Sequence, residues 1–348
     1  MASEQPLFLK NLWYFAFHGS QVRKGKLIQK EVLGERIAFG RDERGKVFAL
    51  KDNCPHRGVP LSQGWFDGQT IQCCYHGWKF NCSGTCTDIP AMADKTFDVS
   101  KIKVYQYPCN EINGTVWVYI PHNKLQTEDA EKHLPNLLVD LGKKFLHVET
   151  VTMPCDIDHS VIGLIDPAHV TFVHQSWFWR SSKNLKLKEK KFEPSEKGFK
   201  MVRHKPSANS KGYSVLKGNR STEIDFQLPG NRFEHIQVGN HEIVSITTLT
   251  PINETKTELN HIFYTSIGLI KFLWWPLRSL GKAFIGQDLG VFEKLRQGLE
   301  TNPTLMLIGE PDTQARWYYE LKKKWVQSVE EKSEFVNTLQ PQTLHWIT

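Results

Sequence analysis

The sequence has few features of a membrane, secreted or nucleic-acid-binding protein. No uninterrupted apolar run reaches the roughly 20 residues that a membrane-spanning helix needs. The start, MASEQPLFLKNLWYFAF, lacks the basic segment, long apolar core and cleavage site of a signal peptide. A net charge of only +7 in 348 residues, with no aromatic-basic repeat, argues against a nucleic-acid partner. We therefore expect a cytoplasmic protein that binds no nucleic acid.

The seven cysteines do not form the pattern of a disulfide-stabilised protein. Their number is odd, and five of them lie between Cys54 and Cys86. A secreted disulfide framework normally has an even, spread-out set. The crowding favours thiols that bind a metal centre in a reducing compartment.

The first ~120 residues are expected to form short strands separated by Gly, Pro and Asn. Alternating segments of this kind are Arg36–Phe39, Lys46–Leu50, Thr70–Cys73 and Thr115–Ile120. The polar segment Pro121–Pro135 has no apolar periodicity and is expected to be a linker. These features predict an all-β domain over residues 1–125 and a second domain over residues 126–348.

The second domain is expected to combine a sheet with late helices, which makes the chain α+β. Expected strands are 145–153, 199–205, 213–216, 223–228, 235–238, 243–250 and 258–266, and expected helices are 158–173, 282–299 and 312–328. The lysine-rich stretch Lys183–Lys191 is expected to be an exposed loop.

Two short segments each offer one thiolate and one imidazole. Cys54 and His56 are followed, after the 16 residues that separate His56 from Cys73, by Cys73 and His76. A zinc ion accepts two Cys and two His, but zinc fingers normally group Cys with Cys and His with His. A [2Fe–2S] cluster with both Cys on one iron and both His on the other needs one of each from every loop. Cys74 offers a thiol in a different register.

These two sequence motifs resemble the cluster motif of the Rieske family; they read Cys-Pro-His-Arg-Gly and Cys-Cys-Tyr-His-Gly-Trp. The resemblance implies that Cys54, His56, Cys73 and His76 bind a [2Fe–2S] cluster, with Cys74 directed into the sheet.

A second motif holds Asp166, His169 and His174. The two histidines are five residues apart, so both can reach one metal only if a regular helix ends or bulges between them. Two imidazoles and one carboxylate on one face of Fe(II) leave open positions for O₂ and substrate.

This run resembles the Asp-x-x-His-x₄-His motif of Rieske non-haem iron oxygenases, in their terminal oxygenase (alpha subunit) component. The resemblance implies that His169 and His174 bind Fe(II), with Asp288 as the third ligand and Glu293 as the alternative. Asp166 would hydrogen-bond His169 and, across a subunit interface, His76, and so act as a catalytic bridge between the two iron sites.

The resemblance also implies a fold and a function. The second domain would be a curved antiparallel sheet wrapped around helices, of the helix-grip or START-like kind. The chain would assemble as a homotrimer, receive electrons from a separate reductase or ferredoxin, and use O₂ to hydroxylate or oxidatively demethylate an apolar or aromatic organic substrate. Two alternatives stay open, an electron-transfer protein and a ligand-binding protein with an inactive iron site.

One residue departs from the family pattern, and one apolar stretch has two possible roles. Gly163 stands where relatives often carry Asn, so a polar group is either missing here or supplied by Asp158 or His159. The apolar stretch Ile267–Ile285, with Trp274 and Trp275, is expected either to roof the active site or to contact a membrane surface.

Overall fold

The computed structural model describes residues 7–94, 96–127, 129–135, 137, 145–174, 185–205, 219–268, 270 and 274–348. The chain divides into two compact units. One is Lys10–Asn136, and the other joins the described part of Met1–Leu9 to Leu137–Thr348. The polar segment after residue 125 belongs with the first unit, because the Trp13 indole donates a buried hydrogen bond to the Ala130 carbonyl at 2.7 Å. The functional boundary at residue 125 stays a prediction.

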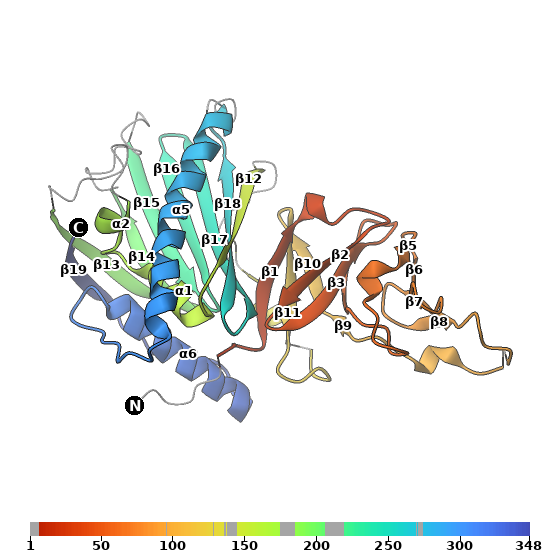
Figure 1. Cartoon of the computed structure of the whole chain (residues 1–348). Coiled ribbons are helices and arrows are strands. Elements are labelled where there is room, and N and C mark those ends of the chain that lie inside the picture. The colour runs from red at the N-terminus through yellow and green to blue at the C-terminus, as the bar shows by residue number, and fades with distance from the viewer. Residues whose placement is uncertain are drawn as a thin grey trace. The chain divides into compact units, whose positions relative to one another are not determined.

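The first unit contains three small antiparallel sheets (Figure 1). They are β1(Leu12–His18)-β11(Thr115–Ile120)-β10(Cys109–Ile112), β2(Leu27–Val32)-β3(Glu35–Arg41)-β4(Val47–Lys51)-β9(Gln106–Tyr107), and β5(Trp65–Phe66)-β6(Thr70–Gln72)-β7(Lys79–Asn81)-β8(Cys86–Asp88). Short 3-10 turns lie at Gly19–Gln21, Leu61–Gln63, Val99–Lys101 and Glu131–His133.

A buried apolar cluster underlies the loops that carry the cysteine and histidine motifs. Cys54 and Cys73 belong to this cluster together with Phe48, Leu61 and Ile71. Each such side chain contributes about 1.5–3 kcal/mol when it is removed from water. The core therefore fixes the two cysteines as part of the hydrophobic packing of the unit.

The second unit is built on one eight-stranded antiparallel sheet. Its strands, in spatial order, are β12(Phe145–Met153), β18(Lys256–Thr265), β17(His241–Asn253), β16(Asn231–Val238), β15(Arg220–Gln227), β14(Gly198–His204), β13(Leu187–Ser195) and β19(Gln342–Ile347). The central strand β17 is rich in β-branched residues and buried over most of its length, as expected for a strand covered on both faces.

In the described part of the chain, the helices of this unit are α1(Ile157–Ile165), α2(Val170–Val173), α5(Trp274–Leu299) and α6(Thr313–Glu331). Figure 1 shows α5 crossing in front of the central strands, with α1 and α6 at its lower end. A buried ion pair joins α1 to α6, because Lys322 Nζ lies 2.6 Å from both carboxylate oxygens of Asp158. Among the described residues no helix is both long enough and apolar enough to cross a membrane.

The α+β class expected from the sequence is confirmed, and two elements differ from expectation. The single helix expected over 158–173 is broken, because α1 ends at Ile165 and α2 begins only at Val170. Pro167 lies in this break, and proline disfavours helical backbone at the residue before it. Part of the expected lysine-rich loop is strand β13, whose lysines pair in register with β19. The expected strand 213–216 lies outside the described residues.

Candidate metal centres

The two loops that carry the first motif have the same backbone geometry. In the first, Cys54 N donates to Val59 O at 2.8 Å and Gly58 N donates to Cys54 O at 2.8 Å. In the second, Cys73 N donates to Trp78 O at 2.9 Å and Gly77 N donates to Cys73 O at 3.0 Å. Both turns need a left-handed residue, and Gly58 and Gly77 supply it with φ of 74° and 71°. The sequence therefore builds two matched turns, each beginning at a cysteine.

These turns separate the four candidate ligands by burial. Cys54 and Cys73 are each 2% exposed, whereas His56 is partly exposed and His76 is exposed. The two imidazole rings lie 4.6 Å apart, centroid to centroid. A small pocket between the turns is lined by Cys54, His56, Arg57, Val59, Cys73, Tyr75, His76 and Trp78. Two inner sulfurs and two outer nitrogens fit a cluster with one iron at each depth.

The electrostatics of this pocket fit a cation. Burial, with a further contribution from the neighbouring Cys73, raises the pKa of the Cys54 thiol to about 11. A backbone hydrogen bond from His56 partly opposes this rise. Because thiolate is the form that binds metal, the iron's positive charge is what would hold both sulfurs deprotonated at this depth. Desolvation, followed by His76 and Arg57, lowers the pKa of His56. The neutral imidazole needed for ligation is therefore favoured.

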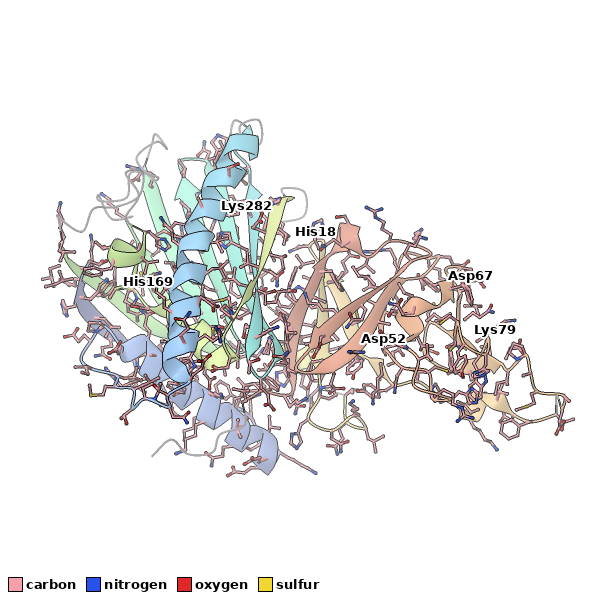
Figure 2. All side chains as sticks on the ribbon, viewed as in Figure 1. His18, Asp52, Asp67, Lys79, His169 and Lys282 are labelled. Carbon is pink, nitrogen blue, oxygen red and sulfur yellow. The ribbon has the colours of Figure 1, made fainter. Side chains whose placement is uncertain are left out.

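Neighbouring side chains hold the two turns in place. Asp52, which is labelled in Figure 2, precedes the first turn and accepts hydrogen bonds from Ser62 N at 2.8 Å and Ser62 Oγ at 2.6 Å. The Trp78 indole stacks on His56 with ring centroids 4.7 Å apart and planes 5° apart. Cys74 is exposed. The expectation that it points into the sheet is wrong, because the second turn directs Cys73 inward and its neighbour outward.

The second candidate centre joins α2 to α5. His169 immediately precedes α2, His174 immediately follows it, and Asp288 lies within α5. The break after α1 makes this possible, since one short turn now separates the two imidazoles. Their ligand atoms and that of Asp288 all lie within 4.8 Å of one another. Figure 2 shows His169 on the side of α5 that faces α2.

The distances and the buried groups of this triad fit one metal ion. His174 Nε2 lies 3.3 Å, and His169 Nε2 lies 3.9 Å, from Asp288 Oδ1. With metal–ligand bonds of about 2.1 Å, neighbouring corners of an octahedron are ~3 Å apart. The His174 side chain is fully buried, yet its Nε2 makes no hydrogen bond. A buried imidazole nitrogen without a partner is costly, and a metal ion would satisfy it.

Two residues that the sequence analysis gave no role orient His174. Gln287 Oε1 lies 3.0 Å from His174 Nδ1, so the amide oxygen accepts the proton there and leaves Nε2 as the ligand atom. The Phe284 ring stacks on His174 with centroids 3.6 Å apart and planes 17° apart. Both precede Asp288 on α5 within one turn. The neighbouring Gln287-Asp288 pair was the only sequence signal that could have identified Gln287.

His169 is held by the backbone of Asp166 more closely than by its carboxylate. His169 Nδ1 lies 2.8 Å from the Asp166 carbonyl oxygen but 3.8 Å from Asp166 Oδ2. Asp166 Oδ1 accepts a hydrogen bond from Ala168 N at 2.7 Å. Burial lowers the pKa of His169, although Asp166 and Asp288 partly oppose this effect. The imidazole is therefore neutral, as a metal ligand must be.

The space at Gly163 is filled by an apolar ring. A Cβ at this position would come within 2.3 Å of Phe292 Cζ, on α5. The expected polar replacements are occupied elsewhere, because Asp158 pairs with Lys322 and His159 Nδ1 lies 2.8 Å from Asp156 Oδ2. Packing of α1 against α5 accounts for the glycine.

The alternative third ligand, Glu293, lies apart from the triad. Its carboxylate is about half exposed and pairs with Arg296 at 2.7 Å. Of the two candidate carboxylates, only Asp288 groups with the histidines in the described part of the chain.

Comparisons with known proteins agree with the first motif. Residues 12–108 match the family model of the Rieske [2Fe-2S] domain. The chain is 34% identical over 174 residues to chlorophyllide a oxygenase of Chlamydomonas reinhardtii, covering 49% of this chain and 25% of the relative. It is 30% identical over 168 residues to the 3-chlorobenzoate-3,4-dioxygenase oxygenase subunit of Comamonas testosteroni, covering 48% and 38%. The match spans less than half of each relative.

The likeness in fold extends over nearly the whole chain. A crystal structure of dicamba monooxygenase bound to dicamba superposes with a TM-score of 0.75 at 20% identity, covering 91% of this chain and 98% of that one. Another structure of that enzyme contains non-haem iron. The match to the family model confirms the Rieske [2Fe–2S] domain expected from the first motif, and His169, His174 and Asp288 form a group that could hold a metal ion.

Proposed function

From the premise that the chain has the motifs and the fold of the Rieske non-haem iron oxygenases, we propose that it is the terminal oxygenase of a multicomponent system. In this proposal it uses O₂ and electrons from a separate reductase or ferredoxin to hydroxylate or oxidatively demethylate an organic substrate. Cys54, His56, Cys73 and His76 hold the [2Fe–2S] cluster, and His169, His174 and Asp288 hold Fe(II).

One observation carries the proposal. A chain with a Rieske domain also brings the ligand atoms of two neighbouring histidines and of an aspartate distant in sequence within 4.8 Å of one another. An electron-transfer protein would need only the first of these sites. When bound, the cluster supplies single electrons and the mononuclear iron supplies coordination positions for O₂ and substrate.

The protein's own groups prepare the mononuclear site. Gln287 fixes the His174 tautomer and Phe284 fixes the plane of its ring. The Asp166 carbonyl orients His169 in the same way. Such contacts around metal ligands typically change metal affinity or activity 10- to 100-fold.

Asp166 is the proposed bridge between the two kinds of iron site. Its side chain is 34% exposed, so it is open to a group from outside the unit. In the proposed homotrimer that group is the partner subunit's His76. Large apolar side chains are exposed beside both centres, with Tyr75 61% and Phe172 55% exposed. Such groups suit an interface between copies, and native mass spectrometry should give about three times the 40.2 kDa chain mass.

The beginning of the apolar stretch Ile267–Ile285 supports the interpretation that this stretch roofs the active site rather than contacts a membrane surface. Ile267 and Ile270 pack on a buried cluster formed by Ile236, Val238 and Ile243. The side chains of Trp274 and Trp275 lie outside the described residues. The proposed location is cytoplasmic, where the seven free cysteines would stay reduced.

The test is to replace one ligand and count the iron. Asp288→Ala should remove one of about three irons per chain and abolish substrate-dependent O₂ uptake, while the cluster's visible spectrum persists. Glu293→Ala is the matched control, because its carboxylate pairs with Arg296. Unchanged iron content and O₂ uptake in Asp288→Ala would contradict the proposal. A wild-type chain with only the cluster irons would favour electron transfer, and one with all irons but no O₂ uptake would favour ligand binding.

A further inference from the structure

The sheet face that α5 and α6 cover is polar across four neighbouring strands. Directly paired residues of an antiparallel sheet share one face. One row of pairs runs through Phe226, Arg232, Thr247, His261 and Glu149, and the next runs through Ile224, Glu234, Ser245, Phe263 and His147.

Contacts at both ends of the rows identify the face. Phe226 packs on Tyr318 of α6, with ring centroids 6.1 Å apart. At the other end Glu149 Oε1 lies 3.3 Å from Lys282 Nζ of α5. Helices therefore cover the two rows of residues. Lys282 of α5, which is labelled in Figure 2, lies at the end of the rows on the β12 side. We call Arg232, Glu234, Thr247, His261 and Glu149, with their neighbours Ser245 and His147, the polar band.

Members of the polar band form hydrogen bonds and ion pairs with one another. His261 Nδ1 lies 2.8 Å from Thr247 Oγ1, and His261 Nε2 lies 3.3 Å from Ser245 Oγ. Glu149 Oε2 lies 2.9 Å from His147 Nε2. Arg232 Nη1 lies 3.2 Å from Glu234 Oε2. The band thus presents donors and acceptors together, with cationic and anionic side chains in equal number once Lys282 is included.

A core that contains such a band of charged and polar side chains is less stabilising than an apolar core. Taking paired charges out of water often costs more than their attraction returns, and apolar residues of similar size would stabilise the fold as well or better. Burial lowers the pKa of His261 to about 4, with Arg232 as a further cause, so its imidazole is neutral at physiological pH. The side chains of Arg232 and Glu234 are still 23% and 13% exposed, so solvent reaches them beneath the helices. Partly exposed polar side chains on a helix-covered face are the kind of groups that orient a bound ligand.

Helix α5 links the band to the candidate iron site, because Lys282 pairs with Glu149 of the band and Asp288 belongs to the triad. Lys282 and Asp288 are six residues apart on this helix, which is about 9 Å of helical rise. The length of an ordinary small molecule covers that distance. A substrate held at the band would therefore extend towards the triad.

We propose that the polar band is the specificity surface of the active site and selects a heteroatom-rich, hydrogen-bonding substrate of no net charge over a hydrocarbon of the same shape. This inference rests on the proposed function and narrows the apolar or aromatic substrate expected from sequence to one that also offers hydrogen-bonding heteroatoms. A hydrocarbon would strip water from Arg232, Glu234 and their partners without returning a hydrogen bond. A compound with ring nitrogens, amides or hydroxyls would return several.

Matched probes test this inference without knowledge of the natural substrate. The pairs are naphthalene with quinazolin-4-one, indene with benzimidazole, and fluorene with carbazole. Binding is followed in the iron- and cluster-loaded protein by the electron paramagnetic resonance spectrum of the nitric oxide adduct of the mononuclear Fe(II). The nitrogen-containing members should bind at least ~10-fold more tightly, because a site built for hydrogen bonds rejects analogues that lack them. Equal or tighter binding of the hydrocarbons, or no binding by any probe, overturns the proposal.

Variants separate the band from general effects on the fold. Thr247→Val keeps the shape of the side chain, and Arg232→Gln keeps a donor but removes the charge. Each should weaken the nitrogen-containing probes about 10-fold and leave the hydrocarbons unchanged, while equal weakening of both classes would contradict the assignment. A third variant, Glu149→Gln, is compared with the control variant Glu223→Gln. Glu223 lies on strand β15 and on the face of the sheet opposite to the band. Iron is counted in every sample, so a missing mononuclear iron refutes the proposed function, whereas a hydrocarbon preference with iron present refutes only this inference.

Discussion

At the scale of single residues, orientation of the candidate ligands matters as much as their identity. His174 offers Nε2 to a metal because Nδ1 is engaged by Gln287 and the ring is stacked on Phe284. His169 depends on a backbone carbonyl for the same purpose. Substitution at Gln287 therefore tests the site without removing a ligand.

Gln287→Leu should weaken Fe(II) binding about 10- to 100-fold, because the His174 tautomer is no longer fixed. The measurement is a titration of Fe(II) into chelated protein, with the cluster spectrum as an internal check on folding. Gln287→Glu, which keeps an acceptor at the same reach, should stay near the wild-type affinity. Equal affinities for the Leu and wild-type proteins would show that the contact has no positioning role.

The identity of the candidate ligands could be predicted from the sequence, whereas the contacts that orient them could not. The mixed Cys/His loops and the Asp-x-x-His-x₄-His run were readable because their chemistry is local. The role of Gln287 and the position of Phe292 depend on how α5 lies against α1 and α2, which no local pattern states. The outward direction of Cys74 followed from a turn geometry that only the backbone hydrogen bonds reveal.

At the scale of elements, the break between α1 and α2 brings two histidines five residues apart to one point. The N-terminus of α1 is fixed by Asp156, which accepts from His159 N at 3.0 Å and also lies beside the His159 ring. The hydrogen bond to Asp156 raises the pKa of His159, against burial. Burial would raise the pKa of Asp156, but the hydrogen bonds from His159 outweigh it and lower that pKa.

This pair predicts a pH dependence of stability. The His159 contribution is complete below about pH 6.5 and is lost as pH rises through its raised folded value. The Asp156 contribution is complete above about pH 4 and is lost as pH falls through its lowered folded value. Asp156→Asn, which can still cap the helix, should therefore lower the free energy of unfolding by about 1 kcal/mol at pH 6 and by less at pH 9. Urea denaturation at the two pH values measures this, and a loss that is larger at pH 9 would contradict the assignment.

The contact of α1 with α5 gives a second prediction at this scale. Gly163→Ala should destabilise the protein by about 1–3 kcal/mol, because the new methyl group overlaps the buried Phe292 ring. The double variant with Phe292→Leu should recover part of that loss. Gly281→Ala on the exposed side of α5 has no atom within 4 Å of its new methyl group, so it should be neutral or slightly stabilising. Thermal unfolding that ranks Gly163→Ala with Gly281→Ala would refute the packing account.

The elements themselves were only partly predictable. The long β-branched strands and the late helices followed from periodicity, and the strand Phe145–Met153 was expected with the bounds that β12 has. The edge pair β13 and β19 was missed because its lysines alternate with few apolar residues, and its stability comes from pairing between distant segments. Pairing of that kind is a tertiary effect that local propensity does not encode.

At the scale of the whole molecule, the chain combines two candidate metal sites that differ in their chemistry. Residues 12–108 match a domain that carries electrons, and the second unit gathers a triad suited to iron that binds O₂. Sequence similarity to known proteins covers about half of the chain, and similarity in fold covers nearly all of it.

The central claim, that one polypeptide binds two chemically distinct iron centres, can be tested by a single measurement. Mössbauer spectroscopy of chain loaded anaerobically with isotopically enriched iron, then reduced, resolves each iron by its ligands. The account predicts a Rieske pair, with one iron bound by sulfur and one by nitrogen, and a separate high-spin Fe(II) in a ratio of two cluster irons to one. A spectrum without the pair, or with the pair alone, would contradict it.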